Sequence, residues 1–109
     1  MPEACPHLTA AFAVLGKRWT GVILGVVRSG PVRFTDLHRS IPGLSDKVLA
    51  ERLQELASSG LIERVDAEQA NCAGRAGSCV YRLTETGEKL GPALDAIGAW
   101  ARAELEPAR

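Results

Sequence analysis

The side chains best suited to bind a partner lie on one stretch of the chain, residues 45–59. Its outward positions recur at helical spacing opposite an apolar stripe, and they are Lys47, Ala50, Glu51 and Gln54. Glutamine can form paired hydrogen bonds with adenine, lysine can reach guanine or phosphate, an alanine methyl can contact thymine, and glutamate can accept from cytosine. Glu51 could equally pair with Lys47, one helical turn earlier. The pattern suits a helix that contacts DNA bases, but an ordinary surface helix would share it.

Arginine and small polar side chains near this stretch are candidates for contacts with the DNA backbone, since such groups fix a protein's position on the phosphates. The candidates are Arg33, Thr35, Ser45 and Arg75. Each could also be an ordinary solvated residue. For Arg52, at the edge of the apolar stripe, we expect a structural role or a phosphate contact more than base recognition. His38 is most simply a surface residue.

The three cysteines are the remaining reactive groups, and an odd number does not make a disulfide framework. Cys5 directly precedes the first predicted helix, where the helix N-terminus lowers the pKa of a thiol and favours the thiolate. His7 could help. Position alone does not set reactivity, so a sensing thiol and an inert one are both open.

Cys72 and Cys79 flank a Gly-rich hexapeptide, and three interpretations compete. We rank a reversible disulfide or thiol switch first and inert thiols second. Zinc comes last, because a structural site needs four ligands and its cysteine pairs are usually closer together. We therefore expect no metal and no cofactor.

The elements that must position these groups are mostly helices. We predict an arm and first helix over 1–16, an apolar helix around 22–27, a very short strand at 32–34 and a helix at 35–40. Pro42-Gly43 then makes the turn into the helix at 45–59, with Ser45 as its N-cap. The two helices form a helix-turn-helix over 34–59.

A hairpin and a final helix follow. Strands at 61–65 and 80–83 enclose a loop and make a wing over 61–83. Thr84 caps a last helix over 85–105, which Pro92 should kink because proline removes a backbone donor. The expected fold is α+β, mainly α: one winged helix-turn-helix domain over 1–109 with additional helices at both ends.

Those end helices have a surplus apolar stripe, made by Leu8, Phe12, Leu94, Ile97 and Trp100. The stripe could close the monomer's own core. We favour a homodimer interface, because helix-turn-helix proteins that bind palindromic operators need two copies about one DNA turn apart.

The overall charge is neutral, with 13 basic and 13 acidic residues, but residues 16–64 hold eight Lys/Arg against five Asp/Glu. Double-stranded DNA is thus a possible partner that composition alone does not establish. The longest apolar run, residues 21–27, is far too short for a membrane span. Without an evident signal peptide, we expect a cytoplasmic protein that binds no membrane.

With these elements the chain resembles the HxlR-type bacterial transcriptional regulators, a branch close to the MarR-like winged helices. The matching segments are Cys5-Pro6, 15–20, 30–37, 41–45, 49–53, 60–64, 81–87 and 90–94. The resemblance implies a homodimeric DNA-binding transcription factor whose dimer is built from the first and last helices. In redox-sensing members a cysteine occupies the place of Cys5, and its oxidation changes DNA binding. The longer hairpin tip at 67–79, with its two cysteines, departs from the family.

An enzyme is not expected, because no nucleophile, base and acid recur at a recognisable spacing. The expected effector is unknown, with an oxidant or electrophile as the candidate. Two alternatives stay open: a winged helix that binds another protein, and a regulator controlled by a small-molecule ligand without thiol chemistry.

Overall fold

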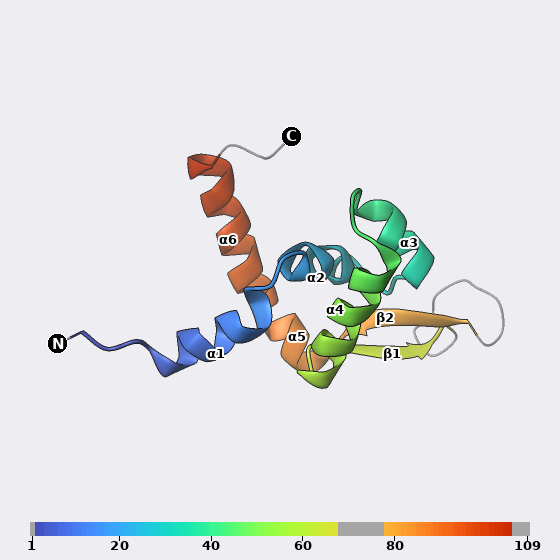
Figure 1. The fold of residues 1–109 in the computed structure, drawn as a ribbon, viewed down its shortest axis with the longest axis horizontal. Helices are drawn as coiled ribbons and strands as arrows, with labels where there is room; N and C mark the ends of the chain where they lie inside the picture. The colour runs from blue at the N-terminus through green and yellow to red at the C-terminus, as the bar shows by residue number, and fades with distance from the viewer. Residues whose placement is uncertain (1, 68–77, 106–109) are drawn as a thin grey trace.

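The computed structural model describes residues 2–67 and 78–105 of the chain (Figure 1). The elements, in chain order, are α1 (Pro6–Leu15), α2 (Thr20–Arg28), α3 (Phe34–Ser40), α4 (Asp46–Ser58), β1 (Ile62–Asp66), β2 (Cys79–Leu83), α5 (Glu85–Lys89) and α6 (Gly91–Glu104). The predicted winged helix-turn-helix, in which a helix-turn-helix is followed by a two-stranded hairpin, is confirmed.

The core lies where α2, α3 and α4 meet the hairpin. Its fully buried side chains, each at most 3% exposed, include Ile23, Leu24, Val27, Leu37, Ile41, Leu49, Leu53, Leu56 and Ile62. On α4 the buried leucines recur at helical spacing, so one face of that helix enters the core and the opposite face remains outside. The spacing of the apolar residues in the sequence therefore determines which face of α4 is exposed.

The hairpin is antiparallel and pairs Ile62 with Leu83 at one end and Asp66 with Cys79 at the other. The short strand predicted at 32–34 is smaller than expected. Only Val32 joins the sheet, as an isolated bridge to Tyr81, and Phe34 is already the first residue of α3. Arg33 keeps an extended backbone as the N-cap residue, so the helix begins one residue earlier than predicted.

Two predicted helix caps are confirmed. The Ser45 hydroxyl accepts a hydrogen bond from the Val48 amide at 3.1 Å, and the Thr84 hydroxyl accepts one from the Gly87 amide at 3.1 Å. Each cap satisfies an amide in the first helical turn, which has no partner within the helix.

The expected single, kinked helix over 85–105 is wrong in detail, because two helices, α5 and α6, meet at Leu90. Pro92 lies in the first turn of α6 and not in the interior of a longer helix. In a first turn the missing N–H of proline costs no hydrogen bond, so this proline begins a helix.

The first helix contacts the core only near its C-terminal end, where Val14 and Leu15 are half-buried against it. Figure 1 shows α1 projecting from the helix-turn-helix on the same side as α6, and no residue of α1 is buried. Over the residues described, no single helix is long and apolar enough to cross a membrane; only α1 and α2 together, across an 81° bend, meet those limits of length and composition.

Candidate DNA-binding surface and thiol sites

The outward face of α4 is the candidate base-contacting surface. Lys47, Ala50, Glu51 and Gln54 are all exposed on this helix. Gln54 differs from the others, because it borders a hollow of about 330 Å³ shared with Ala13 and Lys17. The first half of the helix is therefore the more open part of the face.

The candidate phosphate contacts surround this helix unevenly. Thr35 is exposed in the first turn of α3, whereas Arg33 is half-buried at its N-cap. The Ser45 hydroxyl is already engaged as the α4 cap. Arg75 lies outside the described residues.

His38 is not the plain surface residue that the sequence suggests. Its Nε2 atom lies 2.6 Å from the Leu44 carbonyl oxygen and 3.3 Å from the Asp46 carboxylate. It thus connects α3 to the start of α4 across a turn in which Gly43 adopts a φ of +88°. That conformation favours glycine, because a β-carbon would be strained there.

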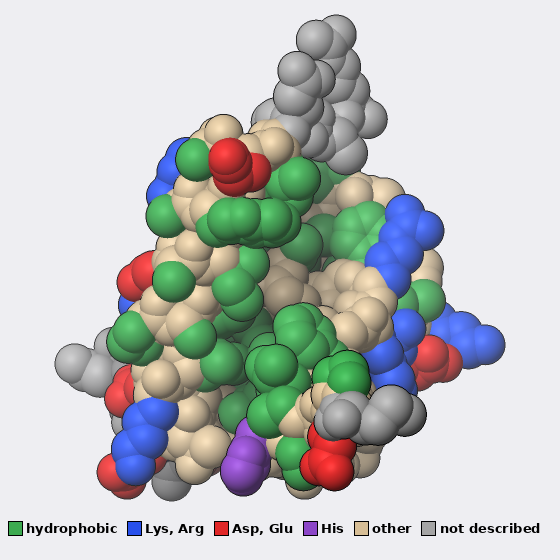
Figure 2. Space-filling view, turned by 90° about the vertical axis from the view of Figure 1, so that its left-hand side faces the viewer, with side chains coloured by type: hydrophobic (Ala, Val, Ile, Leu, Met, Phe, Trp, Pro, Cys, Tyr) green, Lys and Arg blue, Asp and Glu red, His purple; other side chains and the backbone are tan. Residues whose placement is uncertain are grey.

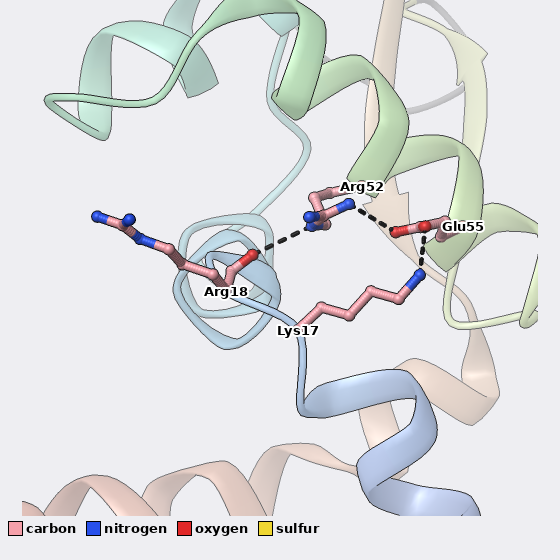
Figure 3. A network of polar contacts seen from close by, with 4 residues as sticks. All are labelled: Lys17, Arg18, Arg52 and Glu55. Carbon is pink, nitrogen blue, oxygen red and sulfur yellow. Dashed lines mark hydrogen bonds and ion pairs between the residues drawn. The ribbon is translucent and has the colours of Figure 1, made fainter.

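Arg52 has the structural role that was one of its two expected roles. Its Nε donates to the Arg18 carbonyl oxygen at 3.1 Å, and its Nη1 lies 3.1 Å from Glu55 Oε1. The other carboxylate oxygen of Glu55 accepts from Lys17 Nζ at 2.6 Å (Figure 3). The hydrogen bond from Lys17 is the main reason that the pKa of the Glu55 carboxyl is lowered. We name these three side chains, Lys17, Arg52 and Glu55, the joint cluster.

The joint cluster could not be found from sequence periodicity. Lys17 and Glu55 are 38 residues apart, and the only signal was the position of Arg52 beside the apolar stripe. Figure 3 shows that the cluster connects the segment after α1 to α4.

The apolar surfaces of α1 and α6 lie on one side of the molecule. Figure 2 shows hydrophobic side chains along α6 and around the projecting α1, with a recess between the helices. Leu8 and Phe12 are each 59% exposed, Ile97 is 51% and Trp100 is 56%. Leu94 differs from this expected set, because it is half-buried and packs against the core.

The position of α6 relative to α2 is held by an ion pair between Arg28 and Asp95. Their hydrogen bond raises the pKa of Arg28 and lowers the pKa of Asp95. A β-carbon at Gly91 would lie 2.7 Å from Arg28 Nε, so the glycine at the start of α6 leaves room for the Arg28 guanidinium.

Of the cysteines, Cys5 and Cys79 are described and both are free thiols. Cys5 is exposed at the N-cap position of α1, where its side chain makes no capping hydrogen bond. Cys79 is half-buried in β2 opposite Asp66. Cys72 lies outside the described residues, and so does any pairing with it. Within the described ranges, no group of three His, Cys, Asp or Glu side chains could hold a metal ion.

A helix-turn-helix with an exposed polar second helix, followed by a β-hairpin, defines the class of winged-helix DNA-binding transcriptional regulators. The profile of one such family, the HxlR-like helix-turn-helix proteins, matches residues 14–109. The chain belongs to the HxlR-like family.

The relatives agree with this assignment. The chain is 39% identical to the HTH-type transcriptional regulator YodB of Bacillus subtilis over 103 residues, which are 94% of this chain and 88% of YodB. The structure of reduced YodB is similar with a TM-score of 0.76 at 37% identity, covering 98% of this chain and 100% of that one. Quinone-bound YodB is similar with a TM-score of 0.74 at 38% identity, covering 92% and 99%.

Proposed function

We propose that this regulator is a homodimer that binds a palindromic operator through α4, and that oxidation or alkylation of Cys5 changes its affinity for that operator. The observation that supports it best is the arrangement of two free surfaces. The polar face of α4 is exposed, and the large apolar side chains of α1 and α6 are exposed elsewhere on the same chain.

The apolar surface supports the dimer. Four large side chains on α1 and α6 are each more than half exposed: Leu8, Phe12, Ile97 and Trp100. Each square ångström of apolar surface removed from water contributes about 25 cal/mol, so covering this surface with a second copy is favourable. A second copy also supplies the second recognition helix that a palindrome requires.

The proposal is tested by the salt dependence of DNA binding. A duplex selected from a random library with the full-length protein is titrated between about 50 and 200 mM salt. Phosphate contacts release counterions, so we expect the affinity to fall on the order of a thousandfold over that range for a protein with several contacts. If no duplex is bound even at low salt, operator binding is wrong and a winged helix that binds another protein is favoured.

The thiol part of the proposal is supported by the place of Cys5. The thiol is exposed beside the first turn of α1, a helix of the proposed interface. YodB, which is similar over nearly the whole chain, has been solved in a quinone-bound form. The electron pair of a Cys5 thiolate can add to a ring carbon of a quinone and form a C–S bond, which reduces the ring. The hydrogen on the attacked carbon leaves as a proton, and the two oxygens take up that proton and one from solvent, so the product is a hydroquinone thioether.

Cys5→Ser is expected to bind the selected duplex as the parent does, but to lose the response to 1,4-benzoquinone. For the parent we expect a change in affinity of at least about tenfold, within the range of typical allosteric couplings. DNA titrations with and without quinone measure this, and mass spectrometry locates the adduct. The matched control is Cys72→Ser with Cys79→Ser, which keeps Cys5 and should respond like the parent.

A hollow favours the second candidate, control by a ligand without thiol chemistry. It measures about 360 Å³ and is lined mainly by apolar residues of α1, the α4–β1 turn and α5, among them Ala11, Leu15, Leu61 and Leu90. This volume lies at the lower end of the range for ligand sites. A quinone response that persists in the variant with all three cysteines replaced by serine would favour this candidate over thiol sensing.

A further inference from the structure

The contact between α1 and the helix-turn-helix is sparsely packed. No residue of α1 is buried, and hollows of about 330 and 360 Å³ border its C-terminal half. Val14 and Ser59 line both hollows. Val14 and Leu15 pack against the core at this end of α1. The adjoining hollows leave few further packing contacts to fix the direction of the helix.

The joint cluster supplies a polar connection at this place. Lys17 is the second residue after α1, and its Nζ lies 2.6 Å from Glu55 Oε2 on α4. Arg52 holds the other oxygen of the same carboxylate at 3.1 Å and also donates to the Arg18 carbonyl oxygen at 3.1 Å. Two of the three side chains, Arg52 and Glu55, thus lie on α4, and they contact Lys17 and the Arg18 carbonyl in the segment after α1. The arginine is the least exposed of them, with 18% of its side chain exposed.

One residue beside the joint cluster has an unusual backbone conformation. Trp19 has a φ of +81°, a left-handed value that is strained for a bulky residue. The guanidinium of Arg18 lies 4.8 Å from the centre of the Trp19 ring. The same ring approaches Gly43 in the α3–α4 turn, since a β-carbon there would lie 3.7 Å from it. The chain between α1 and α2 therefore contacts both the α3–α4 turn and the C-terminal half of α4, and it is not a free linker.

We propose that Lys17, Arg52 and Glu55 are positioning residues that fix the direction of α1 relative to α4. In the homodimer on which this inference depends, α1 belongs to the interface and α4 contacts DNA. The angle between them then sets the separation of the two recognition helices. One base pair of extra spacing moves a half-site by about 3.4 Å along the DNA and rotates it by roughly 35°. A small change at the joint is therefore enough to change which operator spacing fits.

The test is a double-mutant cycle read out on operator spacing. Lys17→Met removes the ammonium group, and Glu55→Gln removes the charge of the carboxylate. Both substitutions, alone or combined, keep the approximate size of the side chains. Each is titrated with three duplexes: the one selected with the parent, and versions with the half-sites one base pair closer or farther apart. A fourth duplex with one half-site reports on α4 itself.

We expect the parent to prefer the selected spacing by at least about tenfold, since misplaced half-sites lose one recognition helix. In both single variants the preference should fall to roughly threefold or less, and the double variant should be no worse than either single one, because coupled residues are not additive. Half-site affinity should stay within about twofold of the parent. The matched control, Lys89→Met with Glu85→Gln, removes an exposed ion pair of 3.8 Å within α5 and should keep the parent's preference.

Distinct results separate this inference from the proposed function. If the parent binds no duplex, the proposed function itself fails. If the parent binds but has no spacing preference, or if the variants keep its preference, the positioning role is wrong. Loss of half-site and full-site affinity to the same extent would also overturn it, because that result indicates damage to α4 and not a changed angle.

Discussion

Trp100→Asp is expected to turn the proposed dimer into a monomer, and Phe12→Asp is expected to act in the same way from α1. The two aromatic rings are 56% and 59% exposed, so neither is needed to complete the monomer's core. In a dimer, either aspartate would be a charge removed from water without a partner, which is strongly unfavourable. Because two linked recognition helices gain on the order of a hundredfold or more in affinity over one, the operator affinity should fall by about that factor.

Sedimentation velocity measures the oligomeric state, and a DNA titration measures the loss of affinity. Arg102→Gln is the matched control, because it lowers the net charge by one, as each aspartate substitution does. Arg102 is exposed on α6 and lies two helical turns after Asp95, on the face away from Trp100. It should remain a dimer. An unchanged sedimentation profile for Trp100→Asp would place the interface elsewhere.

The parts of the fold that were predicted are those with local signals in the sequence. The Ser45 and Thr84 caps precede helices directly, and each needs only the amide three residues later. The free face of α4 follows from leucines at helical spacing. The separation of α5 from α6 was missed because Pro92 suits both a kink and a helix start, and the sequence pattern does not distinguish them.

The contacts that hold the elements together could not be predicted. The Lys17–Glu55 pair spans 38 residues and the Arg28–Asp95 pair spans 67, and no periodicity links such positions. Likewise, the contact of His38 with the Leu44 carbonyl depends on how tightly the α3–α4 turn closes. Exposure is therefore easier to predict than the partner of a polar side chain. The candidate site was predicted as a surface, whereas the joint cluster required the structure.

Lys47→Ala combined with Gln54→Ala is the second large effect, and it should remove operator binding while leaving the dimer intact. Both side chains are exposed on α4, and neither belongs to the apolar surface of α1 and α6. A good contact to a base contributes about 1–3 kcal/mol of discrimination, and a phosphate contact adds the electrostatic gain of counterion release, so losing one of each should lower operator affinity on the order of a hundredfold. Sedimentation velocity should show the parent's dimer.

The two single variants separate the roles. Loss of a phosphate contact at Lys47 should weaken binding to all sequences and reduce the salt slope by about one, whereas loss of a base contact at Gln54 should relax the preference at one operator position. Gln54 also borders the hollow next to Lys17, at the less open end of this face of α4. We therefore expect Gln54→Ala to lower the operator affinity less than Lys47→Ala does. Ser58→Ala, an exposed position one turn further along α4, is the matched control and should bind normally. Parent-like affinity in the double variant would show that α4 does not contact the operator through these side chains.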